Sequence, residues 1–346
     1  MGEAVAEGER EVRPEFTGSV REYFRIWIVN LFFTLITLGI YSAWAKVRKK
    51  RYFYGSTRFD GDSFDYFGSP KAILRGRVLA FVVFVIYAFA GELYPNSQYV
   101  FWALALLLLP WLMMRALAFN ARNSAFRGLR FDFAGKPKDA ARVYLGMPIL
   151  VLLSGGLAYG WFMARQKEFV ASNHRFGTSG FSCELSGTKF FGVYFRAGLI
   201  LLAFVVPAVG VLIFLAFKRV LPDSWGWVGF VLSSIFFYAG YAVSLAYVQA
   251  RTANMLWNSV EGQGVRFTST LSAIRLAKLY VGNIVAMVCS VGLLIPWAVI
   301  RTLRYKLDNF TMFVAGSPVF EANPALPKVG AAGQELGDIF NLDLGL

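Results

Sequence analysis

The chain has 346 residues, of which 57% are hydrophobic, 17% aromatic and only 16% charged. Soluble domains carry about 25% charged residues, so the composition excludes an ordinary soluble protein and indicates an integral membrane protein. The net charge of +14 does not indicate nucleic-acid binding, because the Lys and Arg residues flank apolar stretches and no nucleic-acid-binding motif accompanies them.

The chain opens with a polar N-terminal tail, residues 1–20, in which no short apolar core leads to a small-residue cleavage site, so we expect no cleaved secretory signal. Arg21–Tyr52 follow, with basic residues at both ends and a glycine near the middle. Ile26–Ala45 carry no charge, and as one helix these residues are long enough to cross a bilayer core of about 30 Å.

The next segment, Ser56–Gly68, is polar and aromatic. Its Asp60-Gly61 pair, flanked by aromatic residues, predicts a β-hairpin, because Asp-Gly favours a tight turn. Two apolar spans, Ile73–Tyr94 and Tyr99–Ala118, are separated by a short loop and predict a helical hairpin.

These features recur along the chain. Asn123–Gly135 resembles the first β-hairpin, and a further pair of apolar spans lies later in the chain. In order, the later segments are Val143–Met163 as a second copy of the opening stretch, Asn173–Gly187 as a third polar segment, Phe190–Phe217 and Trp225–Val248 as apolar spans, Asn258–Ser269 as a fourth polar segment, Leu279–Ile300 as a third copy and Asn309–Phe320 as a fifth polar segment.

The three copies align without a gap when a glycine is taken as the origin of each. A Trp lies five residues on and an Arg nine residues on: Gly39, Trp44 and Arg48; Gly156, Trp161 and Arg165; Gly292, Trp297 and Arg301. Asn30 and Asn283 also correspond. This register predicts three divergent internal repeats, near residues 14–70, 123–190 and 254–320, in one membrane domain of residues 21–320. Residues 321–346 are rich in Pro, Gly and Ala and predict a disordered tail.

The stretch NLFFTLITLGIYSAWAKVRKKRYFYGSTRFDGDSFDY, residues 30–66, and its weaker echoes resemble the YjgN-like proteins of bacterial inner membranes. The resemblance covers most of the chain outside its two tails. It implies a multi-pass inner-membrane protein, and it carries over no activity and no catalytic residue.

Two topologies compete. Either all seven apolar stretches cross the membrane, or four helices cross and the three glycine-centred copies re-enter on one side. Counted by segment, Lys and Arg divide 22 against 13 with seven crossings and 33 against 2 with three re-entrant copies. Basic residues mark the cytoplasmic side. We therefore favour an all-α multi-pass protein with four transmembrane helices, three re-entrant segments and short cytoplasmic β-hairpins, with seven transmembrane helices as the alternative.

The repeated Trp and Arg residues allow two interpretations. Arg48, Arg165 and Arg301 could bind an anion or a lipid headgroup. Alternatively, the three Trp residues form an interfacial belt and each Arg, one helical turn away, extends to water. We favour the second interpretation.

Asn30 and Asn283 likewise could line a polar path or join neighbouring helices by hydrogen bonds, and we favour the second role. No catalytic motif is present, and the lone His174 has no partnering Cys or carboxylate cluster in the sequence. Two cysteines cannot make a metal site alone. We therefore expect no enzymatic activity, no cofactor and no metal.

The sequence thus predicts an inner-membrane protein whose partners are membrane lipids, chiefly anionic ones. Two functions stay open. The first is a channel or transporter for a small solute or anion, because repeats and re-entrant segments are common in transporters. The second is a membrane scaffold or a membrane-shaping, lipid-binding protein. A polar cavity lined by Asn30 and Asn283 would favour the first function, and a filled centre the second. Oligomeric state is not predicted, and a homo-oligomer is one alternative.

Overall fold

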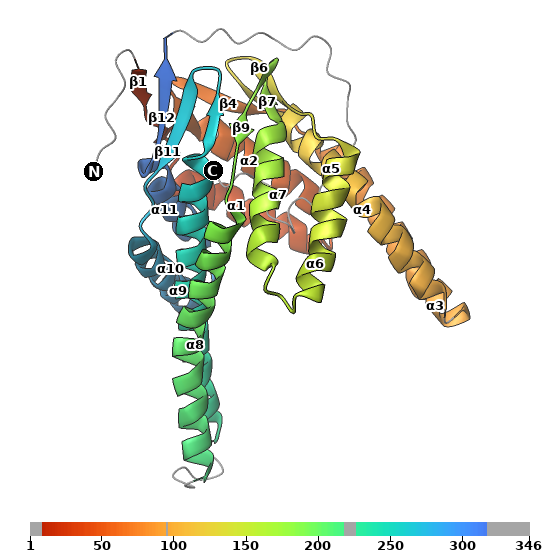
Figure 1. The fold of residues 1–346 in the computed structure, drawn as a ribbon, viewed down its shortest axis with the longest axis vertical. Coiled ribbons are helices and arrows are strands. Elements are labelled where there is room, and N and C mark those ends of the chain that lie inside the picture. Colours follow the sequence, from red (N-terminus) through yellow and green to blue (C-terminus); the bar gives the residue numbers. More distant parts are fainter. Residues whose placement is uncertain (1–8, 95, 218–225, 317–346) are drawn as a thin grey trace.

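A computed structural model describes residues 9–94, 96–217 and 226–316 (Figure 1). The segment 321–346, for which the sequence predicts disorder, lies outside the described residues. The fold is mostly helical. Its helices are α1 (Val20–Ile36), α2 (Ser42–Ser56), α3 (Pro70–Leu93), α4 (Ser97–Arg122), α5 (Pro137–Ala141), the π-helical turn η1 (Arg142–Gly146), α6 (Met147–Leu153), α7 (Tyr159–Asn173), α8 (Gly187–Phe217), α9 (Gly226–Trp257), α10 (Ala273–Cys289) and α11 (Ile295–Asp308).

Four helices of the described part, α3, α4, α8 and α9, are long and apolar enough to cross a membrane. They coincide with the four apolar spans that the sequence predicts. Their large side chains are mostly exposed: Phe81, Trp102 and Phe230, for example, are each at least 65% exposed. Apolar surface of this extent needs lipid around it. In Figure 1, α8 and α9 run side by side away from the rest of the molecule.

Each glycine-centred stretch forms two short helices joined by a turn: α1 and α2, α6 and α7, α10 and α11. We call these three units the helical hairpins. Ile26–Ala45 do not form a single helix, because α1 ends at Ile36 and α2 begins at Ser42. The chain reverses direction at the glycine instead, so that the two arms of each helical hairpin pack against each other.

Short strands occupy one end of the molecule (Figure 1). They are β1 (Glu9–Val12), β2 (Glu15–Phe16), β3 (Thr57–Phe59), β4 (Asp62–Tyr66), β5 (Ser124–Phe126), β6 (Leu129–Phe133), β7 (His174–Phe176), β8 (Ser179–Gly180), β9 (Ser182–Cys183), β10 (Val260–Gly262), β11 (Val265–Ser269) and β12 (Phe310–Ala315). The predicted hairpin at Asp60-Gly61 is confirmed, and both turn residues have the positive φ angles, 52° and 85°, that such a tight turn requires.

All these strands are antiparallel and form two sheets. One sheet has the order β1-β12-β11-β10-β9 and the other β2-β3-β4-β5-β6-β7-β8. The sheets therefore collect segments from the first and the last parts of the described chain. In particular, Glu9–Val12 pairs with Met312–Ala315. The sequence predicts no strand before residue 20, whereas the structure has β1 and β2 in this polar N-terminal segment.

Candidate functional site

A large cavity, which we call the chamber, lies between the helical hairpins and the strands. Its volume is about 1530 Å³, which exceeds the 300–1,000 Å³ of a typical small-molecule site. The first and third helical hairpins contribute walls through α1, α2 and α11, and α4 contributes a further part. Strands from both sheets form the rest.

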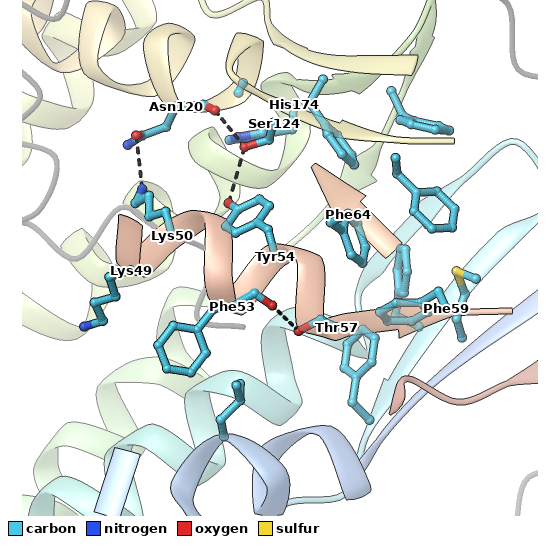
Figure 2. A pocket seen from close by; sticks show the side chains of 18 of the residues that line it. Lys49, Lys50, Phe53, Tyr54, Thr57, Phe59, Phe64, Asn120, Ser124 and His174 are labelled. Atoms are coloured by element: carbon cyan, nitrogen blue, oxygen red, sulfur yellow. Dashed lines mark hydrogen bonds between the residues drawn. The ribbon is translucent and has the colours of Figure 1, made fainter. Parts of the chain in front are cut away.

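Lysines of α2 line the helical part of the chamber: Lys46, Lys49 and Lys50. They lie on one face of α2 because residues three and four positions apart are neighbours on a helix. Figure 2 shows Lys49 and Lys50 beside Phe53 and Tyr54 of the same helix. The ammonium of Lys50 donates a hydrogen bond of 3.2 Å to Asn120 Oδ1 on α4, which orients it (Figure 2).

Two further lysines approach from other helices. Lys167 on α7 lies one turn before Ala171, and Lys306 on α11 one turn after Leu303, and both of these neighbours line the chamber. Burial lowers the pKa of Lys167, and the positive charge of Lys306 lowers it further. Burial also lowers the pKa of Lys306. Lys167 and Lys306 are therefore close enough to interact, and neither is among the described residues that line the chamber.

Among the described residues that line the chamber, Asp60 is the only carboxylate. It lies in the β3–β4 turn, at the ends of the strands that point away from the helices. There it accepts hydrogen bonds of 2.8 Å from Arg10 and 2.9 Å from Arg127, and these two guanidinium groups lower its pKa. Asp60 is thus occupied by two arginines.

The strand side of the chamber is apolar and aromatic. Alternate residues of the strands face the chamber, as the two-residue period of a strand requires. Seven phenylalanines are among them: Phe59, Phe64, Phe126, Phe131, Phe176, Phe267 and Phe310. Phe59 and Phe64 lie together at one end of Figure 2. His174 and Ser124 mark the transition from the lysines to the aromatic rings (Figure 2).

The two asparagines have different surroundings. Asn283 is buried between α10 and α11, where its Nδ2 donates to Thr302 Oγ1 at 3.0 Å and to the Ala298 carbonyl at 3.3 Å. Arg301 donates to Asn283 Oδ1 at 3.3 Å. Asn30 lines the chamber, is 92% buried, and its Oδ1 has no hydrogen-bond partner among the described residues. The equivalent asparagines thus occupy a helix contact in one hairpin and a cavity wall in the other.

The turn glycines share one backbone geometry. Gly39, Gly156 and Gly292 have φ angles of 90°, 92° and 86°, and each amide donates to the carbonyl five residues earlier at 2.8 Å. A hydroxyl two residues before each glycine accepts from the backbone amide of the residue just before the second arm: Thr37 from Tyr41, Ser154 from Ala158 and Ser290 from Leu294, at 2.9–3.0 Å. These bonds fix the turn that joins the two arms.

The three arginines are exposed and do not converge. None of them is among the described residues that line the chamber. Arg165 pairs with Glu168 at 2.9 Å, and Arg301 lies 4.9 Å from the ring centre of Trp297. Among the other tryptophans, Trp161 stacks on Phe191 at 4.7 Å, and Trp44 on Tyr41 at 6.2 Å. Their anion-binding and anchoring roles stay predictions.

Sequence reasoning missed the chamber lysines, although the run KVRKKR at residues 46–51 carried the signal. In the sequence alone, this run indicates only a cytoplasmic segment. The cysteines are free: Cys183 is buried and Cys289 is exposed. Burial raises the pKa of the Cys183 thiol to about 12, with a smaller contribution from Glu168. Among the described residues, no group of three or more His, Cys, Asp or Glu could hold a metal ion.

Comparison with protein families gives one match, over residues 11–339, to a family described as bacterial proteins of unknown function, DUF898. The chain belongs to this family. The resemblance to YjgN-like proteins is also confirmed, since relatives named "Inner membrane protein YjgN" are similar to this chain.

One such relative, from Salmonella typhimurium, is 26% identical over 140 residues, which are 40% of this chain and 35% of the relative. Another, from Escherichia coli K12, is 33% identical over 150 residues, 42% of this chain and 36% of the relative. The matched part of the chain thus spans about a third of the length of these relatives. No solved structure matches it.

Proposed function

We propose that the chain is an inner-membrane protein whose chamber binds an anionic ligand at the cytoplasmic face of the bilayer. In this proposal α3, α4, α8 and α9 cross the membrane. The strands and the basic segments lie in the cytoplasm, and the three helical hairpins enter the bilayer from that side and return. The names of the relatives support the location.

The tips of the helical hairpins support the re-entrant arrangement. Leu38, Leu152 and Val291, one at each tip, are 94%, 80% and 93% exposed. Lipid is the solvent that accepts such side chains without cost. A turn inside the bilayer needs its backbone groups satisfied within the protein, and the amide and hydroxyl bonds at Gly39, Gly156 and Gly292 provide this. Lipid can therefore surround the three tips.

The anionic character of the ligand follows from the lysines. Lys46, Lys49 and Lys50 of α2 line the helical part of the chamber, and Asp60, in the β3–β4 turn, is paired with two arginines. An anion among these ammonium groups accepts charge-assisted hydrogen bonds. This arrangement is the observation that carries the proposal.

Binding is tested on the full chain in nanodiscs with inorganic phosphate and inorganic pyrophosphate as probes. The test variant combines Lys46→Gln, Lys49→Gln and Lys50→Gln. The matched control combines Lys71→Gln, Lys189→Gln and Lys278→Gln, three exposed lysines that do not line the chamber. We expect the test variant to bind at least tenfold more weakly and the control to bind as wild type does. Equal affinities of the two variants, or no binding by wild type, would contradict the proposal.

Anion permeation is a second candidate, because Asn30 and Thr34 extend the chamber along α1 toward the hairpin tip. Release of phosphate from loaded proteoliposomes separates the candidates. Release that the three chamber substitutions abolish establishes permeation, and binding without release establishes a binding protein.

A further inference from the structure

We infer that the ligand is an anionic amphiphile, with its charged group at the chamber lysines and its apolar chain inside the ring of strands. The inference rests on the proposed anion binding and adds the second half of the ligand. Its basis is the joining of the two sheets and the nature of the side chains that they enclose.

The two sheets form a closed ring. The edge strands are β1 and β9 in one sheet and β2 and β8 in the other. Only Arg13 and Pro14 separate β1 from β2, and only Phe181 separates β8 from β9. The chain therefore joins the sheets at both pairs of edges. Contacts span both junctions: the rings of Phe59 and Phe310 lie 6.2 Å apart, and Ser179 Oγ donates to Gln263 Oε1 at 2.5 Å.

The inner face of this ring carries a nearly continuous series of aromatic contacts. Neighbouring ring centres are 4.8–6.2 Å apart along the series Phe181, Phe267, Phe310, Phe59, Phe64, Phe126 and Phe176. All seven side chains line the chamber. We call this set the phenylalanine collar. It belongs to the same cavity as Lys46, Lys49 and Lys50.

A small hydrophilic anion would leave this collar in contact with water. Apolar surface contributes to binding only when a ligand covers it, at about 25 cal/mol per Å². The ligand that matches both parts of the chamber is therefore a molecule with an anionic group and an extended apolar chain. The volume of about 1530 Å³ accommodates a molecule larger than a simple oxyanion.

The chain of the amphiphile lies toward the strands rather than toward the hairpin tips. On the tip side of the lysines the chamber wall mixes the polar residues Asn30, Thr34 and Ser42 with apolar residues such as Leu31, Ile295 and Val299. On the strand side it is formed by the phenylalanine collar together with Val260, Val265 and Val314. The strand side of the chamber therefore suits the apolar chain of the ligand better than the tip side does. The ring thus holds the apolar chain outside the proposed bilayer.

The first experiment compares inorganic phosphate with n-alkyl phosphates of four to eight carbons, on protein in nanodiscs with empty nanodiscs subtracted. Each buried methylene should raise affinity about fourfold. The double variant Phe64→Ser, Phe126→Ser should lose this chain-length dependence and keep phosphate affinity. The control Phe313→Leu changes a β12 side chain that does not line the chamber and should behave as wild type.

The second experiment locates the apolar chain of the ligand directly, so the inference does not depend on how well the serine variant folds. An octyl phosphate with a diazirine at the end of its chain is photolysed with wild-type protein, and labelled peptides are identified by mass spectrometry. We expect label in residues 57–66, 124–131, 260–267 and 310–314. Label confined to the hairpin tips or to α3, α4, α8 and α9 would overturn the inference.

The outcomes separate the two proposals. If inorganic phosphate binds and alkyl phosphates bind no more tightly, the anion site stands and the amphiphile inference fails. If neither probe binds, both proposals fail.

Discussion

At the scale of single residues, three glycines determine where the helical hairpins turn. Gly39, Gly156 and Gly292 follow residues that also have positive φ, 48°, 61° and 50°. Two successive left-handed residues end a helix and reverse the chain, and glycine adopts this conformation without the steric cost of a Cβ. The sequence register that singled out these glycines therefore selected positions with one shared conformation.

Replacing a turn glycine by alanine should destabilise its hairpin. At Gly39 a Cβ would meet no atom within 4 Å, so the cost comes from φ alone and should be about 1 kcal/mol. The measurement is the SDS fraction that half-unfolds the purified protein, which should fall. Gly55→Ala, in α2 with equally open surroundings, should leave it unchanged or raise it. An equal fall for both variants would contradict the role of φ.

The repeated arginines give a second prediction at this scale. If Arg48, Arg165 and Arg301 only extend to the interface, the triple Arg→Lys protein should retain anionic lipid as wild type does, because a cation on a long stem suffices. We expect this result. The assay is lipid retention during purification at two salt concentrations. A tenfold or larger loss in the triple variant at equal folding would instead support bidentate oxyanion binding.

At the scale of elements, the sequence predicted the four long helices and the first β-hairpin because their patterns are local. Length and hydropathy define α3 and α8, and Asp60-Gly61 defines a tight turn. It did not predict β1 or β2, whose four and two residues form strands only because partners distant in sequence, β12 and β3, bind them. Pairing of this kind leaves no local pattern.

The re-entrant arrangement predicts that all ring segments lie in one compartment. Single cysteines at Arg58, Arg130, Arg175 and Glu261, four exposed strand positions, are introduced into a Cys183→Ser, Cys289→Ser background. An impermeant maleimide should label all four in inverted vesicles and none in intact spheroplasts. Labelling of position 175 from the outside, with position 58 labelled only from the inside, would establish seven crossings.

Asp60 connects three elements and gives a prediction for β1. Its carboxylate accepts from Arg10 on β1 and from Arg127 in the β5–β6 turn, and these arginines lower its pKa. The stabilisation is therefore present at neutral pH and is lost as pH falls through the lowered pKa. Asp60→Asn should accelerate amide exchange of residues 9–12 at pH 7. Asp62→Asn, which removes a contact with Arg127 alone, should leave β1 unchanged.

At the scale of the whole molecule, the candidate site was the least predictable feature. The lysines, the phenylalanines and Asn30 were visible in the sequence, but they line one chamber only because the helical hairpins and strands assemble around a common centre. Asn30 and Asn283 illustrate the difficulty. Their positions in the repeats are equivalent, yet their surroundings differ. Asn283 donates a hydrogen bond to Thr302. In the first hairpin the residue that corresponds to Thr302 is Lys49, which lines the chamber.

The pairing of β1 with β12 also determines when the molecule can be completed during synthesis. Residues 9–12 leave the ribosome early, and their partners, residues 312–315, leave it after all the long helices have been made. Until then β1 lacks its partner and the edge of β11 is uncovered, and such edges pair readily with other chains. The ring therefore closes last, so a chain interrupted before residue 310 displays two unpaired strand edges, a mark by which proteases or chaperones can distinguish it from the finished protein.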